Sequence, residues 1–464
     1  MFDLLLKSPT VVDPLAGVNE VRDIGIKDGR VASNETELDP GDARQVLDLA
    51  GKVAMPGIVD SHTHFSREGN SIGQKMMASV GVTTAIDFSS RPKQLVDAVR
   101  KDGAGLNVGA LYPLIPFDTI SSRDPSPDEL EDVIAGAAEN GALGIKLLGG
   151  HHPITPETAA QAIEIANANE IYVASHLGTT ETGSDLRGLR EIPDIVKDYG
   201  LHIAHVNSYC RGAFKPPIEE SLEAVSILQG LGENVVSESY LGTINGTSGE
   251  CKEGQPASHV TRNCLEMKDY PPTKDGLEES IREGYCFVVA KRGDQKVLLS
   301  GREGVEVWEE AETDVGISFP VNSSQSTFFL ATCKREGDFV VDAISTDGGS
   351  YPRNHIVDRG LALVDYGALT FSEFVQKVSA APAQMFGLEG KGSLQVGYDG
   401  DVTVLDTDRN VAVMSVVEGK VRMINGIPID QGGTLLTTEK GKRALSSHSF
   451  PVKTANMEIS PLYS

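Results

Sequence analysis

The middle of the chain alternates between short apolar runs and helical patterns, and this alternation constrains the fold more than any other feature. Apolar runs recur near 53–61, 82–88, 107–115, 142–147, 171–176, 201–206, 233–238 and 341–346. Helical patterns separate most of them, at 71–80, 93–102, 127–140, 156–169, 185–199 and 215–230. Buried strands that alternate with helices are typical of parallel sheets. The class is therefore α/β, and the repeat predicts a closed (β/α)8 TIM-like barrel over residues 53–391.

One part of the barrel region departs from this pattern. Residues at about 240–340 are far too many for one β/α unit, so they leave the seventh strand unplaced. Within them, residues 285–334 begin with YCFVVAKRGDQKVLLSG, which predicts antiparallel strands. We expect an insert that lies over the barrel mouth.

The two ends of the chain are β-rich. Residues 1–52 combine short apolar runs with the turn pair Asp28–Gly29, and residues 392–430 repeat the pattern with turns at Glu418–Gly419 and Asn425–Gly426. Such pairs between apolar runs predict hairpins. We expect 1–52 and 392–430 to build one small β-sandwich domain, and 431–464 to form a polar, irregular C-terminal arm.

Charge and cysteine content exclude several classes of protein. The 66 acidic residues and 41 Lys and Arg give a net charge of −25, which argues against binding to nucleic acid or to an anionic membrane. Five scattered cysteines without a CxxC pair argue against a disulfide framework. No apolar run approaches the ~18 residues of a membrane span, and the N-terminus lacks a signal-peptide pattern. We expect a cytoplasmic protein.

Polar residues stand at the ends of five predicted strands. The segment GIVDSHTH carries two histidines at spacing i, i+2, which places both on one face of a strand. Later strands end in GIKLL, YVASH, HIAH and AISTD. The carboxyl ends of barrel strands meet at one face of the barrel, so the six side chains are expected to converge. They are His62, His64, Lys146, His176, His205 and Asp347.

These residue types predict a binuclear metal centre. Imidazoles bind Zn²⁺ or a similar divalent ion, whereas a lysine cation repels metals. Lys146 fits only if CO₂ carboxylates it, because the carbamate can bridge two ions about 3.5–4 Å apart. We expect a metal-bridging hydroxide as nucleophile and Asp347 as the general base and acid that passes its proton to a leaving nitrogen. A strand-end histidine or an Asp before two glycines is usually structural when it stands alone.

The same residues resemble the amidohydrolase superfamily, in its binuclear branch of hydantoinases, dihydroorotases, isoaspartyl dipeptidases and D-aminoacylases. The similarity includes MPGIVDSHTH, the lysine of GIKLL, the later histidines and aspartate, and the stretch KVSAAPAQMFGL–KGSLQVGYDGDVTVLD at 377–406. The resemblance implies that His62, His64 and Asp347 hold a buried ion, that Lys146 bridges, and that His176 and His205 hold a more exposed ion. It also implies a homo-oligomer.

The lysine on the fourth strand favours hydrolysis of amides or lactams, because the family's deaminases lack it and use one metal. We therefore expect hydrolysis of a C–N bond that is not part of a peptide backbone, above all in a small cyclic amide, as in hydantoinases, dihydropyrimidinases and lactamases. The short interval from His176 to His205 favours the alternative, an N-acyl-D-amino-acid deacylase or isoaspartyl dipeptidase. A non-catalytic scaffold similar to dihydropyrimidinase-related proteins is a third hypothesis, against which the complete set of ligands argues.

Loops that follow the strands are expected to contact the small-molecule substrate. The arginines there could clamp a carboxylate, Tyr209 could donate to a developing oxyanion, and His151 could hydrogen-bond the substrate. Surface ion pairs or supporting roles remain open for Arg67 and His151. The candidates are Arg67, His151, Tyr209, Arg211 and Arg353. His202 lies three residues before His205, on the opposite strand face, and is expected to point toward the helices.

Overall fold

A ring of parallel strands forms the centre of the protein in the computed structural model, which describes residues 1–66 and 72–463. Its strands are β8 Ile58–His64, β9 Val82–Asp87, β10 Leu106–Leu114, β11 Gly144–Leu147, β12 Tyr172–Ser175, β13 Leu201–Ile203, β14 Val235–Tyr240 and β23 Ala343–Ser345. Each pairs with the next along the chain. Two residues after β23, β24 (Gly348–Gly349) pairs in parallel with Thr63 and His64 of β8 and closes the ring. The predicted TIM-like barrel is confirmed, and β14 supplies the unplaced seventh strand.

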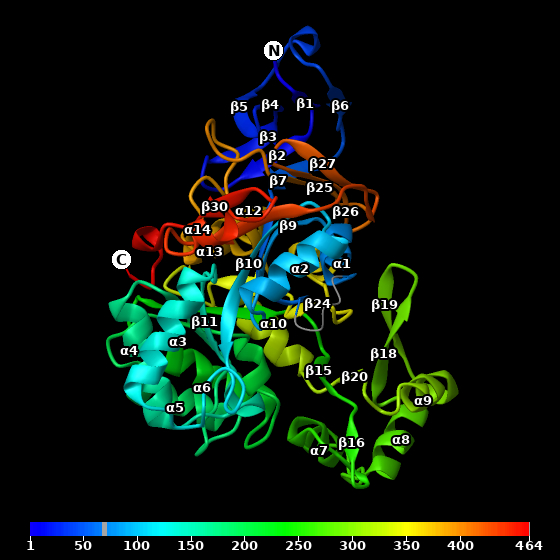
Figure 1. Ribbon diagram of the computed structural model, residues 1–464. Helices are drawn as coiled ribbons and strands as arrows, with labels where there is room; N and C mark the ends of the chain where they lie inside the picture. The colour runs from blue at the N-terminus through cyan, green and yellow to red at the C-terminus, as the bar shows by residue number, and fades with distance from the viewer. Residues whose placement is uncertain (67–71, 464) are drawn as a thin grey trace.

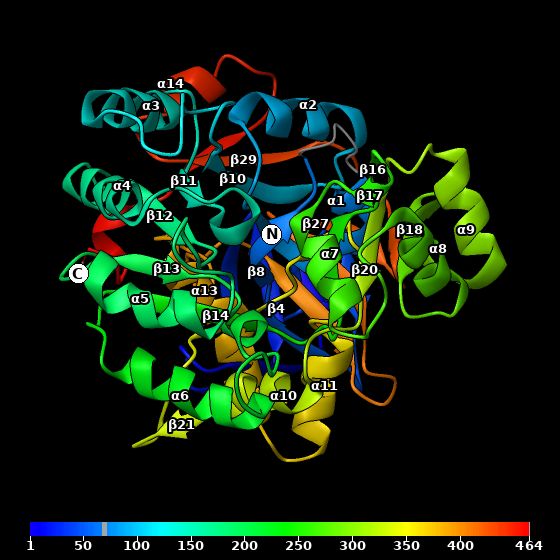
Figure 2. The ribbon, with the colours of Figure 1, turned by 90° about the horizontal axis from the view of Figure 1, so that it is seen from below.

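Helices cover the outside of the ring, as Figure 2 shows for α2 to α6. They are α1 Ile72–Ser79, α2 Pro92–Asp102, α3 Pro127–Glu139, α4 Pro156–Ala168, α5 Leu186–Val196, α6 Pro217–Gln229, α10 Ser324–Thr332, α11 Asp358–Asp365, α12 Phe371–Val375 and α13 Ala381–Met385. Local sequence sets where several begin. Ser126 and Thr155 accept hydrogen bonds from backbone N–H groups in the first turns of α3 and α4, and a proline follows each cap.

Two sheets form the β-rich end at the top of Figure 1. The first, in the order β5-β4-β1-β6, contains β1 Leu4–Lys7, β4 Asp23–Lys27, β5 Arg30–Glu35 and β6 Val46–Asp48. The second, in the order β28-β27-β26-β25-β7-β2-β3, contains β2 Thr10–Asp13, β3 Val18–Val21, β7 Val53–Pro56, β25 Val402–Asp406, β26 Val411–Val417, β27 Lys420–Ile424 and β28 Ile427–Pro428. Leu6 and Ile24 of one sheet share a buried core with Val404 and Val416 of the other. The predicted sandwich from both ends of the chain is confirmed.

The residues between β14 and α10 form a lobe with a core of its own. It contains β15 Asn245–Ser248, β16 Cys251–Lys252, β17 Gln255–Pro256, α7 His259–Glu266, α8 Lys274–Arg282, β18 Phe287–Arg292, β19 Gln295–Leu299, α9 Gly301–Glu310 and β20 Gly316–Phe319. Trp308, Ile317 and Phe319 are buried in its core. β18 and β19 are the antiparallel pair that the sequence predicts, whereas α7 to α9 are not foreseen. Figure 1 shows the lobe at the end of the barrel away from the β sandwich.

The C-terminal arm is more regular than its sequence indicates. β29 (Gly433–Thr437) pairs in parallel with the beginning of β10, and β30 (Val452–Thr454) pairs with β29. The short helix α14 (Lys442–Leu445) lies between them in the sequence. The segment thus adds two strands to the barrel sheet. Within the described residues, none of the helices combines the length and apolar character that crossing a membrane requires.

Candidate metal centre

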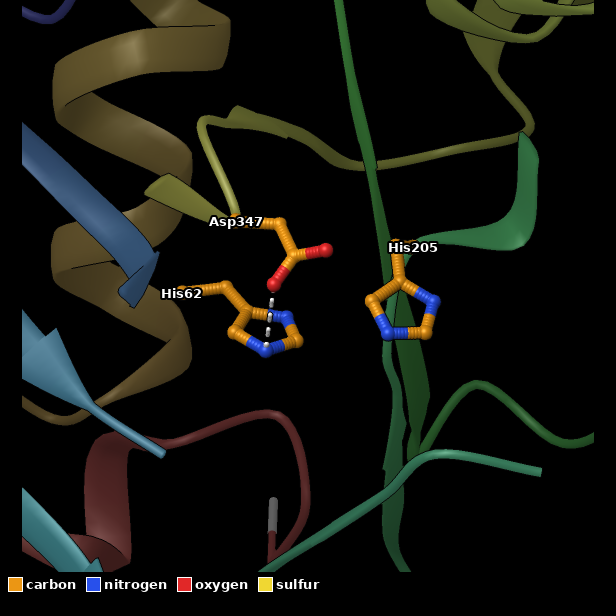
Figure 3. Close-up of side chains that lie close together, drawn as sticks. All are labelled: His62, His205 and Asp347. Carbon is orange, nitrogen blue, oxygen red and sulfur yellow. Dashed lines mark ion pairs between the residues drawn. The ribbon is translucent and has the colours of Figure 1, made fainter. Parts of the chain in front are cut away.

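Three of the predicted ligands converge where β8 meets the end of β23. His62 Nε2 lies 3.3 Å from His64 Nε2. Asp347 Oδ1 lies 3.0 Å from His64 Nε2 and 3.5 Å from His62 Nε2. Figure 3 shows the Asp347 carboxylate directed at the ring of His62, with His205 beside them. His62, His205 and Asp347 each offer one ligand atom within 4.8 Å of the others.

The remaining predicted ligands extend this cluster across the barrel mouth. The ring centroids of His62 and His205 are 5.0 Å apart, and those of His205 and His176 are 4.5 Å apart. Lys146 Nζ lies 4.4 Å from the centroid of the Phe88 ring, which stacks on His62. The structure therefore brings all six predicted side chains into one site.

Several donor atoms in this site are buried without a partner. Lys146 Nζ, His176 Nε2 and His205 Nδ1 have no hydrogen-bond partner in the part of the protein that the structure describes. Buried polar atoms are normally paired, because leaving one unpaired costs about 1–3 kcal/mol. Imidazole nitrogens together with a carboxylate are a donor set that suits zinc-like ions. The residues present therefore fit a divalent metal centre.

Burial sets the protonation of these groups. It lowers the pKa values of His62, His176 and His205 well below the usual value, so the imidazoles are neutral, which is the form that binds metals. Burial also lowers the pKa of Lys146 to about 7, although Glu238 and Asp347 oppose the shift. A substantial fraction of Lys146 is then a neutral amine near pH 7, the form that can react with CO₂.

Asp347 is held by an arginine. Arg353 Nη2 lies 2.7 Å from Asp347 Oδ2, and both side chains are buried. Burial raises the pKa of Asp347, but Arg353 and His64 lower it, and the resulting pKa is about 2. Arg353 Nη1 also donates to the Ile244 carbonyl at the base of the lobe. The structure thus gives Arg353 partners within the protein rather than a free guanidinium for a substrate.

The other predicted substrate contacts have different surroundings. His151 is exposed, with its ring 5.0 Å from that of His176. Tyr209 is buried, and its hydroxyl oxygen accepts a hydrogen bond from the Leu177 N–H at 3.0 Å. Arg211 Nε donates to Asn322 Oδ1 at 2.8 Å. Arg67 lies outside the described residues.

Two polar residues that contact the cluster were not anticipated. Oε1 of Glu238, a residue of β14, lies 2.6 Å from His62 Nδ1. Ser89 Oγ, which follows β9, lies 2.9 Å from His64 Nδ1. Glu238 ends the apolar run 233–238, and an acidic residue at that position was the signal available in the sequence.

The prediction for His202 is wrong. Its ring is fully buried and packs against Phe386 and against Phe88, the ring that stacks on His62. Its Nδ1 lies 3.0 Å from the Tyr172 hydroxyl. β13 ends at Ile203, and His205 has a left-handed backbone with φ of 33°. The alternation of strand faces therefore does not extend to His205, and both histidines can turn toward the barrel interior.

The barrel and its cluster have counterparts among known proteins. The model of the amidohydrolase family matches residues 53–209 and 317–428, more than half of the sequence. The chain belongs to the amidohydrolase family. The resemblance seen in the sequence is thereby confirmed. The matched segments of this amidohydrolase contain all six predicted ligands and omit most of the lobe.

Two curated relatives and one solved structure illustrate the similarity. An allantoinase from Escherichia coli O1:K1 / APEC is 26% identical over 279 residues, which cover 51% of this chain and 58% of the allantoinase. A dihydroorotase from Trichlorobacter lovleyi is 22% identical over 445 residues, covering 87% of this chain and 89% of the relative. The structure of a D-aminoacylase mutant superimposes with a TM-score of 0.66 at 16% identity, over 94% of this chain and 100% of that one. The chain thus spans little more than half of the allantoinase.

Proposed function

We propose that this amidohydrolase hydrolyses a cyclic amide at a binuclear divalent metal centre. The observation that carries the proposal is the convergence of six donor side chains, three of which have buried atoms without a hydrogen-bond partner among the described residues. His62, His64 and Asp347 would hold one ion, His176 and His205 the other, and a carboxylated Lys146 both. The donor set suits Zn²⁺. When bound, such ions polarise a carbonyl and lower the pKa of water.

Asp347 is our candidate for the proton carrier. Its Oδ1 faces His62 and His64, while its Oδ2 is fixed by Arg353. Because its pKa is about 2, Asp347 is ionised at neutral pH, which is the form that can accept a proton. A proton taken from the attacking water is held only weakly, so Asp347 can release it to the leaving nitrogen.

A cyclic amide is favoured because the two curated relatives are an allantoinase and a dihydroorotase. Arg211 is our candidate for binding an anionic group of the substrate. Its Nε is fixed by Asn322, whose Nδ2 donates to the Tyr240 hydroxyl at 2.6 Å. A guanidinium fixed on one side presents its remaining N–H groups in a defined direction. Arg67, His151 and Tyr209 remain further candidates.

Hydrolysis of an N-acyl-D-amino acid or an isoaspartyl dipeptide is the second candidate. The interval from His176 to His205 favours it, because it is shorter than in the hydantoinases that the sequence resembles. The two candidates differ in whether the scissile amide lies in a ring. A screen of substrates can therefore separate them.

The test is an activity screen of metal-loaded and metal-free protein. The substrates are hydantoins, dihydrouracils, dihydroorotate, allantoin and lactams, set against N-acyl-D-amino acids and β-aspartyl dipeptides. We expect ring opening only in the loaded protein, with about two ions per protein molecule by elemental analysis. Cleavage of acyclic amides alone would favour the second candidate. Absence of both bound metal and hydrolysis would support a scaffold.

A further inference from the structure

We infer that Glu238 is a positioning residue that aligns one histidine on each side of the metal centre. The inference rests on the proposed function, because it concerns how this protein prepares its ligands for metal. Glu238 lies on β14, the strand that separates β13 from β23 in the barrel. It is absent from the predicted set of ligands.

A single oxygen of Glu238 contacts both histidines. Oε1 lies 2.6 Å from His62 Nδ1 and accepts the backbone N–H of His205 at 2.7 Å. The other oxygen, Oε2, accepts a hydrogen bond from the Ser345 hydroxyl. One carboxylate therefore connects β8, the end of β13 and β23, three strands that carry or precede predicted ligands.

These contacts define the tautomer of His62. Oε1 accepts the His205 N–H and Oε2 accepts the Ser345 hydroxyl, so we assign Glu238 as a carboxylate. Oε1 then accepts from His62 as well, and His62 Nδ1 carries the proton. Nε2 of the neutral ring then presents its lone pair. This is the nitrogen that faces His64 and Asp347. Glu238 thus directs the lone pair of His62 into the ligand cluster.

The contact with His205 has a second effect. His205 has a left-handed backbone with φ of 33°, which residues other than glycine rarely adopt. The hydrogen bond from its N–H to Glu238 holds the backbone at that residue. The direction of the His205 ring therefore depends on the same carboxylate that orients His62.

Burial alone does not explain Glu238. Glu220 is equally buried, but its oxygens accept the backbone N–H groups of Gly212, Phe214 and Lys215 in a surface loop. The hydrogen bonds of Glu238 described above go instead to residues on or next to the strands that precede the predicted ligands. Glu220 is therefore a control matched in burial and residue type, and its hydrogen bonds in the described part of the chain do not involve a predicted ligand.

The experiment measures metal binding rather than turnover. Zn²⁺ affinity is determined by competition with a chromogenic chelator for the parent protein, Glu238→Ala, Glu238→Gln and Glu220→Ala, and absorption spectra are recorded with Co²⁺. We expect Glu238→Ala to bind Zn²⁺ about 10–100-fold more weakly, with an altered Co²⁺ spectrum. Glu238→Gln should recover most of the affinity, because its amide oxygen can accept both N–H groups. Glu220→Ala should stay within about threefold of the parent, even if its melting temperature falls.

The outcomes separate this inference from the proposed function. Parent-like Zn²⁺ affinity and Co²⁺ spectrum in Glu238→Ala would overturn the role of Glu238 alone. A parent protein that binds no divalent ion would overturn the proposed function and this inference with it. If Glu238→Ala does not fold, ¹⁵N NMR of histidine in the unaltered protein decides the question. A proton on Nδ1 of His62 supports the inference, and a proton on Nε2 refutes it.

Discussion

Lys146 is a buried cation-forming side chain without a hydrogen-bond partner among the described residues. If it bridges the metals as a carbamate, Lys146→Ala should lower kcat/KM by about 100-fold or more and reduce bound metal. A short carboxylic acid can enter the vacated space and supply two oxygens. We therefore expect partial recovery of activity with added acetate or propionate, measured at constant ionic strength.

Lys377→Ala is the control for this experiment. Lys377 is also fully buried, and burial lowers its pKa to about 7 as well. Its Nζ donates to the Val341 carbonyl, outside the ligand cluster. Added carboxylic acids should not affect this variant. Full activity of Lys146→Ala without added acid would show that Lys146 is not a bridging ligand.

The residues of the site were predictable to different degrees. His62 and His64 share a strand, so their spacing alone brings them together, and the ends of parallel strands place the other four ligands nearby. Glu238 was missed because its contacts cross to β8 and β23, which are far away in sequence. The His202 error has a local cause, since the left-handed backbone of His205 interrupts the strand pattern.

At the scale of elements, the two-residue strand β24 bears directly on the site, because it follows Asp347 and pairs with Thr63 and His64 of β8. Gly349 has a φ of +81°, and a Cβ there would lie 2.7 Å from the His64 carbonyl oxygen. Gly349→Ala therefore combines backbone strain with a clash. We expect it to lower the free energy of unfolding by about 2–4 kcal/mol and to reduce activity, because β24 must move away from His64.

Gly367→Ala separates the two effects. Gly367 has a similar φ of +70°, but a Cβ there would meet none of the described atoms within 4 Å. Gly367→Ala should lower the free energy of unfolding only by the cost of the left-handed backbone, about 1–2 kcal/mol. The variant should keep its activity. Thermal unfolding and kcat/KM of both variants provide the measurement. Equal losses of stability, with activity intact in both variants, would contradict the expectation that the clash in Gly349→Ala moves β24 away from His64.

Local signals explain which elements the sequence predicted. The helices α1 to α6 were found within a few residues, because apolar periodicity and N-terminal caps act within each helix. β24 was not found, since two glycines carry no local strand signal and their partner β8 lies almost 300 residues earlier in the sequence. The lobe helices α7 to α9 were not predicted for a similar reason, because their apolar faces pack on a small core that joins distant segments.

At the scale of the whole molecule, buried titratable groups make stability depend on pH. Four buried histidines have pKa values well below that of the unfolded state: His62, His176, His202 and His205. Below about pH 6.5 the unfolded state binds protons that these histidines cannot bind in the fold, so acid destabilises the fold. Burial raises the pKa of Asp60 to about 7 and also raises the pKa of Glu238, which acts in the opposite direction but involves fewer groups.

We therefore expect the metal-free protein to lose stability as the pH falls from 7 to 5. Each net proton taken up on unfolding lowers the free energy of unfolding by about 1.4 kcal/mol for every pH unit of acidification. His202→Phe should make the dependence shallower by about one proton, because the pKa of His202 is lowered by burial in the fold. Urea midpoints at several pH values provide the measurement. Stability that rises toward pH 5 would show that the carboxyls dominate.

The pairing of β7 with β25 has a consequence for how the protein is made. β7 ends at Pro56 and β25 begins at Val402, yet the two strands lie side by side in the sandwich. At about 5–20 residues per second, a ribosome needs on the order of half a minute to supply the missing neighbour. During that time one edge of β7 has no partner and can pair with other nascent proteins. The β sandwich thus exposes an open strand edge through most of translation.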